Sequence, residues 1–341
     1  MSMMFTISPK MIYEEISECA AASLVPLFTS APGVGKSAAV WKFAKDFRLK
    51  MIDVRLSQCM PEDLNGFPMR VGNKATFTPF DMFPIEGDEI PEGYDGWCVF
   101  LDEATSATKP VQAAAYKLIY DKMIGSHKLH ERVIIVAAGN RVGDKAVVNQ
   151  MSTALQSRMI HYDVEVNLPD FLEHAIEADF DRRVTGFVSY LPLKLMDFKP
   201  DHNDKTFTCP RTLEFLSRLI KGKEITPQMA PRIAGTIGQG NAVEFMTFAE
   251  EYDRLPKFAD IIADPIGTPV PPESSTKYAT MSMLIGNSDE ENLEHVLKYI
   301  TKFSMEIQII FSRGMATRFP RLTKEHEAFS AFLLKITTYL T

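Results

Sequence analysis

Apolar residues in the first half of the chain gather in short runs rich in Val, Ile and Phe, and stretches with helical spacing separate these runs. Mostly apolar strands that alternate with helices are typical of a parallel sheet covered on both faces. We therefore expect an α/β fold in which a parallel five-stranded sheet lies between helices. The expected strands are residues 24–28, 51–56, 97–101, 133–138 and 161–166, and the expected helices are residues 38–47, 109–121 and 145–157.

The pattern changes after Leu168, because from there on it favours helices alone. Residues 264–275 interrupt this helical part with four prolines and resemble a linker. Helices are expected at 170–178, 183–190, 210–220, 229–237 and 242–252, and after the linker near 277–285, 290–311 and 324–340.

Two segments between the expected strands have the pattern of β-hairpins. In residues 66–80, two extended stretches flank a Gly72-Asn73 turn, and residues 123–129 form a shorter candidate around Gly125-Ser126. Neither hairpin is needed to complete a nucleotide-binding core. The pattern leaves two interpretations open, which are plain surface loops or moving elements that contact a substrate or line a pore.

The most informative motif is SAPGVGKS, residues 30–37, which follows the first expected strand and precedes a helix. Glycines in such a loop let backbone N–H groups curl around an anion, and the helix N-terminus adds partial positive charge. Lys36 would contact the β- and γ-phosphates of a nucleotide, and the Ser37 hydroxyl would ligate Mg²⁺. The expected nucleotide-binding residues are Ala31, Pro32, Gly33, Val34, Gly35, Lys36, Ser37 and Ala38. Ser30 departs from the usual pattern, which has glycine there.

Polar residues follow two further expected strands. Asp102 and Glu103 end the strand at 97–101, and Asn140 follows the strand at 133–138. Ligands of parallel sheets bind at the carboxyl ends of the strands. Asp102 would hold Mg²⁺ together with Ser37, while Glu103 would polarise the attacking water. The alternatives are that Asp102-Glu103 caps the next helix and that Asn140 is a turn residue; as a functional group, Asn140 would bind the water or the γ-phosphate.

Composition narrows the class of protein. A chain of 341 residues favours two domains, and 45% hydrophobic with 24% charged residues is typical of a globular protein. A net charge of −7 argues against broad nonspecific nucleic-acid binding. The four cysteines are scattered, and neither they nor the histidines have the spacing of a metal site. Without a signal-like N-terminus or a long apolar run, we expect a cytoplasmic protein with no membrane partner.

The motifs SAPGVGKS, VFLDEAT, VAAGN, ALQSRM and FTCPRTLEF occur in this order. Together they resemble the AAA+ ATPases of the MoxR type, phage-encoded members included, over residues 8–255. The resemblance implies an AAA+ core at residues 1–167, a helical lid at 168–263 and a C-terminal helical extension at 276–341. The hairpins at 67–80 and 123–129 would be insertions in that core.

The same resemblance implies a homo-hexameric ring that binds ATP and Mg²⁺ between neighbouring subunits. It makes Arg158 the candidate arginine finger and Arg211 the candidate sensor-2 arginine of the lid, and Arg141, Arg182 and Arg183 are possible substitutes. A guanidinium suits this role because phosphoryl transfer spreads charge over equatorial oxygens. The simpler interpretation of Arg158 is an ordinary surface arginine.

Three functions remain open at this point. The first is an ATPase that remodels or assembles a partner protein in a chaperone-like way, and the resemblance implies a partner with a von Willebrand factor A domain. The second is a nucleic-acid machine such as a helicase or clamp loader, to which Arg70 and Lys74 in the first hairpin would contribute. The third is a nucleotide-responsive scaffold without turnover, which the presence of Lys36, Asp102 and Glu103 disfavours.

Overall fold

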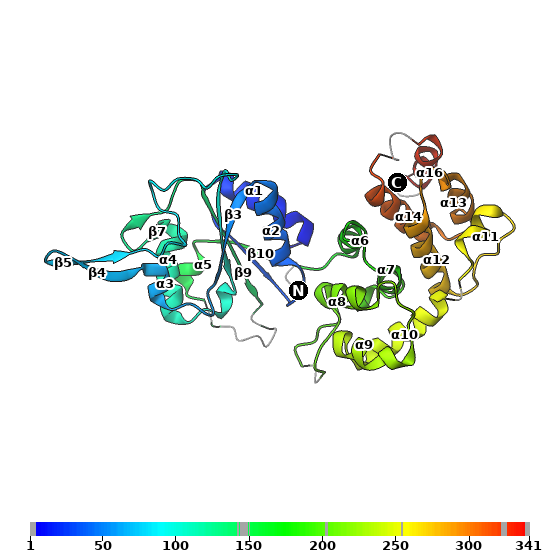
Figure 1. Ribbon diagram of the computed structural model, residues 1–341, viewed down its shortest axis with the longest axis horizontal. Helices are drawn as coiled ribbons and strands as arrows, with labels where there is room; N and C mark the ends of the chain where they lie inside the picture. The colour runs from blue at the N-terminus through cyan, green and yellow to red at the C-terminus, as the bar shows by residue number, and fades with distance from the viewer. Residues whose placement is uncertain are drawn as a thin grey trace. The chain divides into compact units, whose positions relative to one another are not determined.

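The computed structural model contains two compact units, which meet in the sequence between Glu165 and Val166. Figure 1 shows the first unit as strands and helices and the second as helices alone. Each unit is described by itself. The structure describes residues 5–141, 143, 149, 151–201, 204–253, 255–321 and 326–337.

The first unit is built on a parallel sheet of six strands in the order β1-β10-β2-β9-β6-β3. The parallel α/β arrangement expected from the apolar runs is thus confirmed. Each expected run forms one strand of this sheet. The bounds are β2 Pro26–Ser30, β3 Leu49–Arg55, β6 Gly96–Asp102, β9 Val133–Asn140 and β10 Ile160–Val164.

The expected number of five strands is wrong, because β1 (Thr6–Ile7) adds a sixth at the edge of the sheet. Thr6 pairs with Asp163 and Ile7 with Val164 of β10. A strand of two residues is too short for an apolar run or an alternation to show in the sequence. Its pairing is therefore visible only in the structure.

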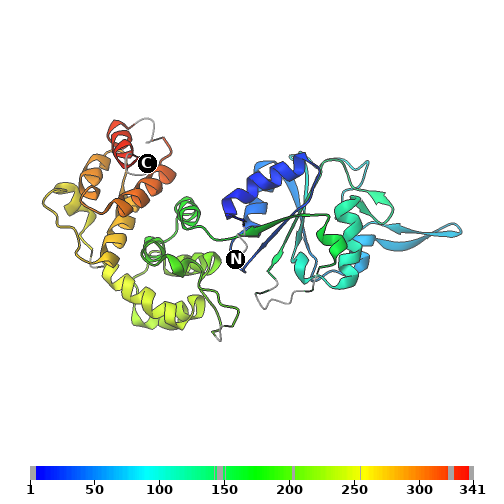
Figure 2. The ribbon, with the colours of Figure 1, turned by 180° about the vertical axis from the view of Figure 1, so that it is seen from behind.

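Helices cover both faces of this sheet (Figures 1 and 2). Helices α1 (Ile12–Ala21) and α2 (Lys36–Asp46) contact β2, β3, β6 and β9. On the opposite face, α4 (Lys109–Tyr120) joins a buried cluster with Val99 and Leu101 of β6. Because successive side chains of a strand alternate between faces, Cys98 and Phe100, both buried, point to the side opposite Val99 and Leu101. The alternating apolar residues of β6 thus contribute to the apolar layers on both faces of the sheet.

Both expected hairpins form. Strands β4 (Phe67–Val71) and β5 (Lys74–Thr78) are antiparallel, and Gly72 takes a φ of 63° in their two-residue turn. The shorter hairpin pairs β7 (Met123–Ile124) with β8 (His127–Lys128). Within the first unit, the β4–β5 ribbon projects away from the sheet (Figures 1 and 2).

The shorter hairpin packs against the base of this ribbon. A His127 ring nitrogen lies 3.0 Å from the Phe77 carbonyl oxygen, and a Cβ at Gly125 would meet the Asn65 carbonyl oxygen at 2.5 Å. Glycine is therefore required at position 125 by both its φ of 57° and this close approach. Of the remaining short helices, α3 (Pro61–Asn65) precedes β4 and α5 (Thr153–Gln156) precedes β10. Residues 145–148 and 150 of the expected helix 145–157 lie outside the described residues.

The second unit contains helices and has two buried apolar clusters. One cluster lies among the helices from α6 to α10, the other among those from α11 to α16, and α12 contributes to both. The division into a lid and an extension stays a prediction. The bounds are α6 Leu168–Glu177, α7 Arg182–Tyr190, α8 Pro210–Ile220, α9 Ala230–Ile237, α10 Gln239–Asp253, α11 Phe258–Ala263, α12 Ser274–Asn287, α13 Leu293–Ile300, α14 Met305–Arg318 and α16 Glu327–Thr337.

One expectation for this unit needs correction. The stretch 290–311 forms two helices, α13 and α14, because Ser304 takes an extended conformation at the start of the second. The proline-rich segment joins α11 to α12 and packs against α13 and the residues that follow it. The Tyr299 hydroxyl donates to the Pro269 carbonyl at 2.9 Å, and Lys302 Nζ donates to the Thr268 carbonyl at 2.6 Å. No helix among the described residues has both the length and the apolar character needed to cross a membrane.

Candidate nucleotide-binding site

The candidate phosphate loop connects the end of β2 to the start of α2. Gly33 and Gly35 adopt positive φ values of 81° and 111°, and Gly35 precedes the first residue of the helix. These conformations suit glycine because a Cβ would strain them. They turn the chain so that α2 begins at Lys36, with the helix N-terminus at the loop. Free N–H groups and the helix dipole make such a terminus attractive to an anion.

Lys36 and Ser30 are joined at the base of this loop. The Lys36 amine donates to the Ser30 hydroxyl at 2.5 Å, and that hydroxyl donates to the Ala31 carbonyl at 2.7 Å. Both side chains are buried. The serine that replaces the usual glycine therefore holds the amine of the lysine at the loop. An ammonium group with three donors can keep this bond and still bind a phosphate oxygen.

The loop meets the strand-end carboxylates through Ser37. Its hydroxyl donates to Asp102 Oδ2 at 3.2 Å, and Asp102 Oδ1 accepts the backbone N–H of Glu103 at 2.8 Å. The sheet order explains the approach, because β2 and β6 flank β9 and all three run in the same direction. A serine hydroxyl and a carboxylate are oxygen ligands of the kind that Mg²⁺ prefers.

Glu103 is held by a residue that the sequence did not single out. Its backbone is left-handed, with a φ of 55°, and its carboxylate accepts a hydrogen bond from the Ser57 hydroxyl. Ser57 follows the end of β3, whose last residue Arg55 is paired with Asp102. The signal that could have revealed it is a polar residue just beyond the end of a neighbouring strand.

A third carboxylate, Asp53 of β3, lies within electrostatic range of Asp102 and Glu103. Burial raises the pKa of Asp53 on β3; Arg55 lowers it, and the charges of Asp102 and Glu103 raise it. These carboxylates therefore repel one another when all are ionised. A divalent cation at Ser37 and Asp102 would relieve this repulsion.

Asn140 ends β9 directly beside the loop. Its Cα is in register with that of Ser30 on β2, and its backbone N–H donates to Thr105 Oγ1 at 2.9 Å. Gly139 makes this approach possible, because a Cβ there would lie 2.5 Å from the same Oγ1 atom. The strand that carries Asn140 is thus fixed against the segment that follows Glu103.

Arg158 lies apart from this cluster. Its guanidinium carbon sits 4.0 Å from the Tyr116 ring centroid and 4.7 Å from that of Tyr120, both on α4. Its Nη1 donates to the Ala154 carbonyl at 2.5 Å. Within the described part of the chain, its polar and ring contacts are with residues 116–157, so the structure does not join Arg158 to the loop of its own chain.

Arg211 belongs to the second unit and is exposed in the first turn of α8. Cys209 and Thr212 cap this turn, with the Cys209 N–H donating to Thr212 Oγ1 at 2.9 Å. The position of Arg211 relative to the loop stays a prediction.

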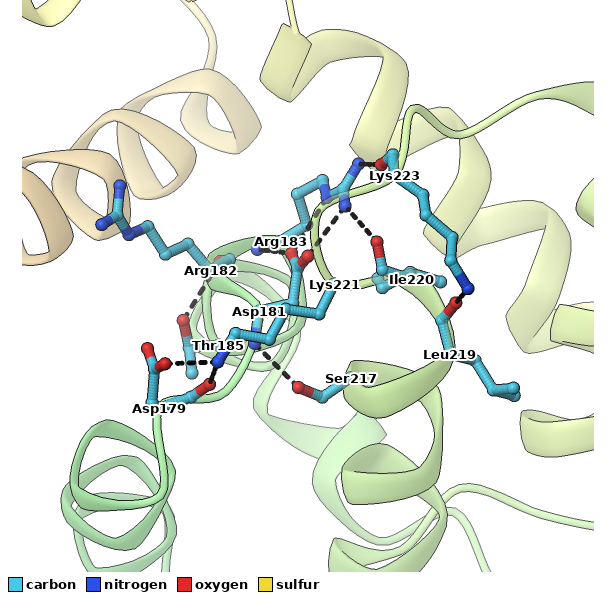
Figure 3. Close-up of polar contacts among 10 residues, drawn as sticks. All are labelled: Asp179, Asp181, Arg182, Arg183, Thr185, Ser217, Leu219, Ile220, Lys221 and Lys223. Atoms are coloured by element: carbon cyan, nitrogen blue, oxygen red, sulfur yellow. Dashed lines mark hydrogen bonds and ion pairs between the residues drawn. The ribbon is translucent and has the colours of Figure 1, made fainter.

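The alternative arginines of the second unit are engaged in holding helices together. Arg183 forms an ion pair with Asp181 at 2.8 Å and donates to the carbonyls of Ile220, the last residue of α8, and of Lys223 just after it (Figure 3). Arg182 donates to Asn287 Oδ1 at 2.6 Å. In the first unit, Arg141 donates to the Val164 carbonyl at 3.1 Å. These contacts give all three arginines a structural role.

The residues present fit a magnesium nucleotide. The loop has N–H donors and a buried lysine that could bind phosphate oxygens, Ser37 and Asp102 offer oxygen ligands of the kind that Mg²⁺ prefers, and Glu103 lies next to them as a candidate base. Tested against known proteins, the chain matches no family model and no curated protein.

Among solved structures, three neighbours cover nearly the whole chain. A candidate ATPase from Cytophaga hutchinsonii has 13% identity and a TM-score of 0.36, covering 97% of this chain and 90% of its own. A point mutant of RuvB from Thermotoga maritima has 14% identity and a TM-score of 0.34, covering 96% and 88%. A DNA replication initiation factor has 14% identity and a TM-score of 0.37, covering 99% and 95%. These superpositions are too loose to carry an argument, so the site rests on its own geometry.

Proposed function

We propose that this protein is a Mg²⁺-dependent ATPase of the AAA+ superfamily, similar to the MoxR type, and that it remodels or assembles a partner protein. The observation that carries the proposal is the contact between the loop and the strand end, in which Ser37 donates to Asp102 at 3.2 Å beside the buried Lys36. Phosphate and metal ligands thereby meet at one place, with Glu103 next to them. This combination is what phosphoryl transfer from ATP to water requires.

The catalytic roles follow from these positions. Lys36 and the loop N–H groups bind the β- and γ-phosphates. Ser37 and Asp102 would hold Mg²⁺, which when bound would neutralise charge on the phosphates. Glu103 accepts a proton from the water whose oxygen bonds to the γ-phosphorus, while the bond to the β,γ-bridging oxygen breaks. Asn140 orients that water or the γ-phosphate. These groups leave the γ-phosphate without a guanidinium.

A ring of six copies would supply the missing positive charge. We assign Arg158 as the finger that reaches the nucleotide of the next subunit, and Arg211 as the lid arginine. The contacts of Arg158 support an assignment in trans, because they lie on α4 and near α5 rather than at the loop of its own chain. A neighbouring copy is the simplest source of a site for this guanidinium.

The β4–β5 ribbon is our candidate contact for the client protein. It projects from the first unit, and Phe67, Met69 and Val71 on one face are at least half exposed. Exposed apolar side chains of this kind mark protein-binding surfaces. We propose a client with a von Willebrand factor A domain, as the resemblance to the MoxR type implies, and a cytoplasmic site of action.

A second candidate function rests on the same ribbon. Arg70 and Lys74 are exposed near its turn, and a ring would present several copies of both to a nucleic-acid backbone. Binding of this kind weakens steeply with salt. A salt-sensitive mobility shift with DNA or RNA that Arg70→Ala reduces would favour a nucleic-acid machine over a protein remodeller.

The test of the ATPase proposal compares Glu103→Gln with wild type. The amide keeps the shape of the side chain but loses its basicity, so turnover should fall about 10²–10⁴-fold while Mg-ATP still binds. Phosphate release and equilibrium binding of ATP measure the two effects. Glu92→Gln, an exposed position in a loop, is the matched control. Wild-type turnover by Glu103→Gln would contradict the assigned role.

A further inference from the structure

Two tyrosines of α4 lie against the guanidinium of Arg158. Tyr116 and Tyr120 are one helical turn apart on the same face of α4, with ring centroids 6.3 Å from each other. The guanidinium carbon lies 4.0 Å from the first centroid and 4.7 Å from the second. Both distances are within the range of a cation–π interaction. We call Tyr116 and Tyr120 the tyrosine clamp.

Ring contacts restrain an arginine without consuming its hydrogen-bond donors. A guanidinium has five N–H groups in its plane, and contact with ring faces leaves that fork of donors available. Nη1 of Arg158 donates to Ala154 and lies 3.3 Å from Ser157 Oγ. Among the described residues, neither Nη2 nor the buried Nε has a hydrogen-bond partner. The clamp thus holds a cation that still has donors to offer.

The clamp is also placed where a second copy could reach it. Tyr120 is 62% exposed, and Tyr116 and Arg158 are partly exposed. Tyrosine and arginine are enriched among the residues that dominate protein interfaces. A surface position would also serve an arginine that acts on the nucleotide of a neighbour.

We infer that Tyr116 and Tyr120 are positioning residues for Arg158, and that they orient its guanidinium toward the γ-phosphate bound by the next copy of this chain. The inference rests on the proposed ATPase function and deepens it. Such restraint lowers the conformational entropy that a long arginine side chain loses when it enters the transition state. Without the clamp, Arg158 would still be present, but its guanidinium would seldom adopt the orientation that reaches the γ-phosphate. Turnover should suffer while ATP binding does not.

The test uses the double variant Tyr116→Leu/Tyr120→Leu in the full-length chain. Leucine keeps apolar bulk on α4 but has no ring face, whereas Tyr116→Phe/Tyr120→Phe keeps the ring faces. We expect kcat to fall about 10–100-fold in the leucine variant with KM nearly unchanged, and to return to within about threefold of wild type in the phenylalanine variant. Tyr94→Ala, another exposed tyrosine, is the control. Equal activity of the leucine and phenylalanine variants would contradict the inference that the ring faces position Arg158.

Mixing gives a second readout. Lys36→Ala cannot bind nucleotide but carries an intact clamp and Arg158. At an interface where the leucine variant binds ATP and Lys36→Ala is the neighbour, the site is complete, so the mixture should exceed the summed activity of its parents. No gain in verified mixed rings would show that the tyrosines act within their own subunit and would overturn the inference.

Arg158→Ala separates this failure from failure of the proposed function. If Arg158→Ala is inactive and the leucine variant turns over at the wild-type rate, the clamp alone is wrong. If the wild-type chain does not hydrolyse ATP, or Arg158→Ala hydrolyses it normally, the function assigned to the site is wrong and the clamp fails with it. Circular dichroism melts of every variant establish that the fold is intact.

Discussion

The carboxyl edge of the sheet and the two candidate arginines are held in place in different ways. At the sheet edge, Ser37, Asp102 and Asn140 lie near one another because β2, β9 and β6 are adjacent and parallel. Arg158 instead packs against tyrosines of α4, and Arg211 sits on a helix of the second unit. Hydrogen bonding within one sheet therefore fixes the first group. The guanidinium of Arg158 is instead held by side chains of α4, and Arg211 belongs to the separate helical unit.

This difference separates binding from turnover. Groups that one sheet positions in advance can bind a nucleotide in a lone chain. In the proposed mechanism, Arg158 adds its positive charge only when a neighbouring copy brings it to the nucleotide, so we expect hydrolysis to depend on assembly. The predictions below test this separation, starting with the change that should have the largest effect.

Arg158→Ala should lose nearly all turnover and keep ATP affinity. A missing arginine finger lowers the rate about 10³–10⁵-fold, which is about 4–7 kcal/mol of activation free energy. Lys36→Ala, by contrast, should lose nucleotide binding itself. Titration with a fluorescent ATP analogue and steady-state phosphate release measure both quantities.

A mixture of these two inactive variants sharpens the result. One type of interface then has ATP bound by the Arg158→Ala subunit and an intact finger from its Lys36→Ala neighbour, so part of the activity should return. Absence of any recovery in verified mixed rings would remove Arg158 from catalysis in trans. A large drop in the ATP affinity of Arg158→Ala would contradict the proposal that the sheet edge binds ATP and that Arg158 serves turnover alone.

Within the second unit, Arg183→Ala should lower the stability of the fold, whereas Arg211→Ala should lower turnover. The side chains of Arg183 and Asp181 are each 9% exposed, so removal of Arg183 leaves a buried carboxylate without its partner (Figure 3). We expect the free energy of unfolding to fall by about 3–5 kcal/mol. Arg211 is exposed, and its removal should change stability by less than about 0.5 kcal/mol while lowering turnover.

Chemical denaturation followed by circular dichroism, read at the transition of the helical unit, measures the first effect, and phosphate release measures the second. If both variants lose stability equally, Arg211 is a structural residue too. If Arg183→Ala is stable but inactive, Arg183 rather than Arg211 serves the nucleotide.

Much of the sheet edge could be predicted from the sequence because its chemistry follows the ends of apolar strands. Asp102 and Asn140 each end a strand with a clear apolar pattern, and parallel strands bring their carboxyl ends to one edge. The candidate phosphate loop is equally visible in the sequence, since its glycines and Lys36 occur at a fixed spacing between a strand and a helix. Local patterns thus sufficed where one sheet determines the neighbours.

The remaining features depend on contacts that leave no local pattern. Thr6–Ile7 is too short to show alternation, and Ser57 is a single serine whose partner lies 46 residues away. Tyr116 and Tyr120 have the spacing of an ordinary helix face, so their contact with Arg158 could not be inferred from that spacing. Tertiary packing determines each of these features.

The smallest expected effect concerns the hydrogen bond from Ser57 to Glu103. This bond stabilises the ionised carboxylate and occupies one of its lone pairs, so it competes with the water that Glu103 has to activate. A single hydrogen bond has a net value of about 0.5–1.5 kcal/mol, and Ser57→Ala should therefore raise basal turnover about 2–10-fold without changing ATP affinity. Ser57→Thr keeps the hydroxyl and should stay near the wild-type rate. Phosphate release by the three proteins at saturating Mg-ATP decides the matter. A fall in turnover for Ser57→Ala would mean that Ser57 orients Glu103 for catalysis, and the sheet edge would then be set for hydrolysis as well as for binding.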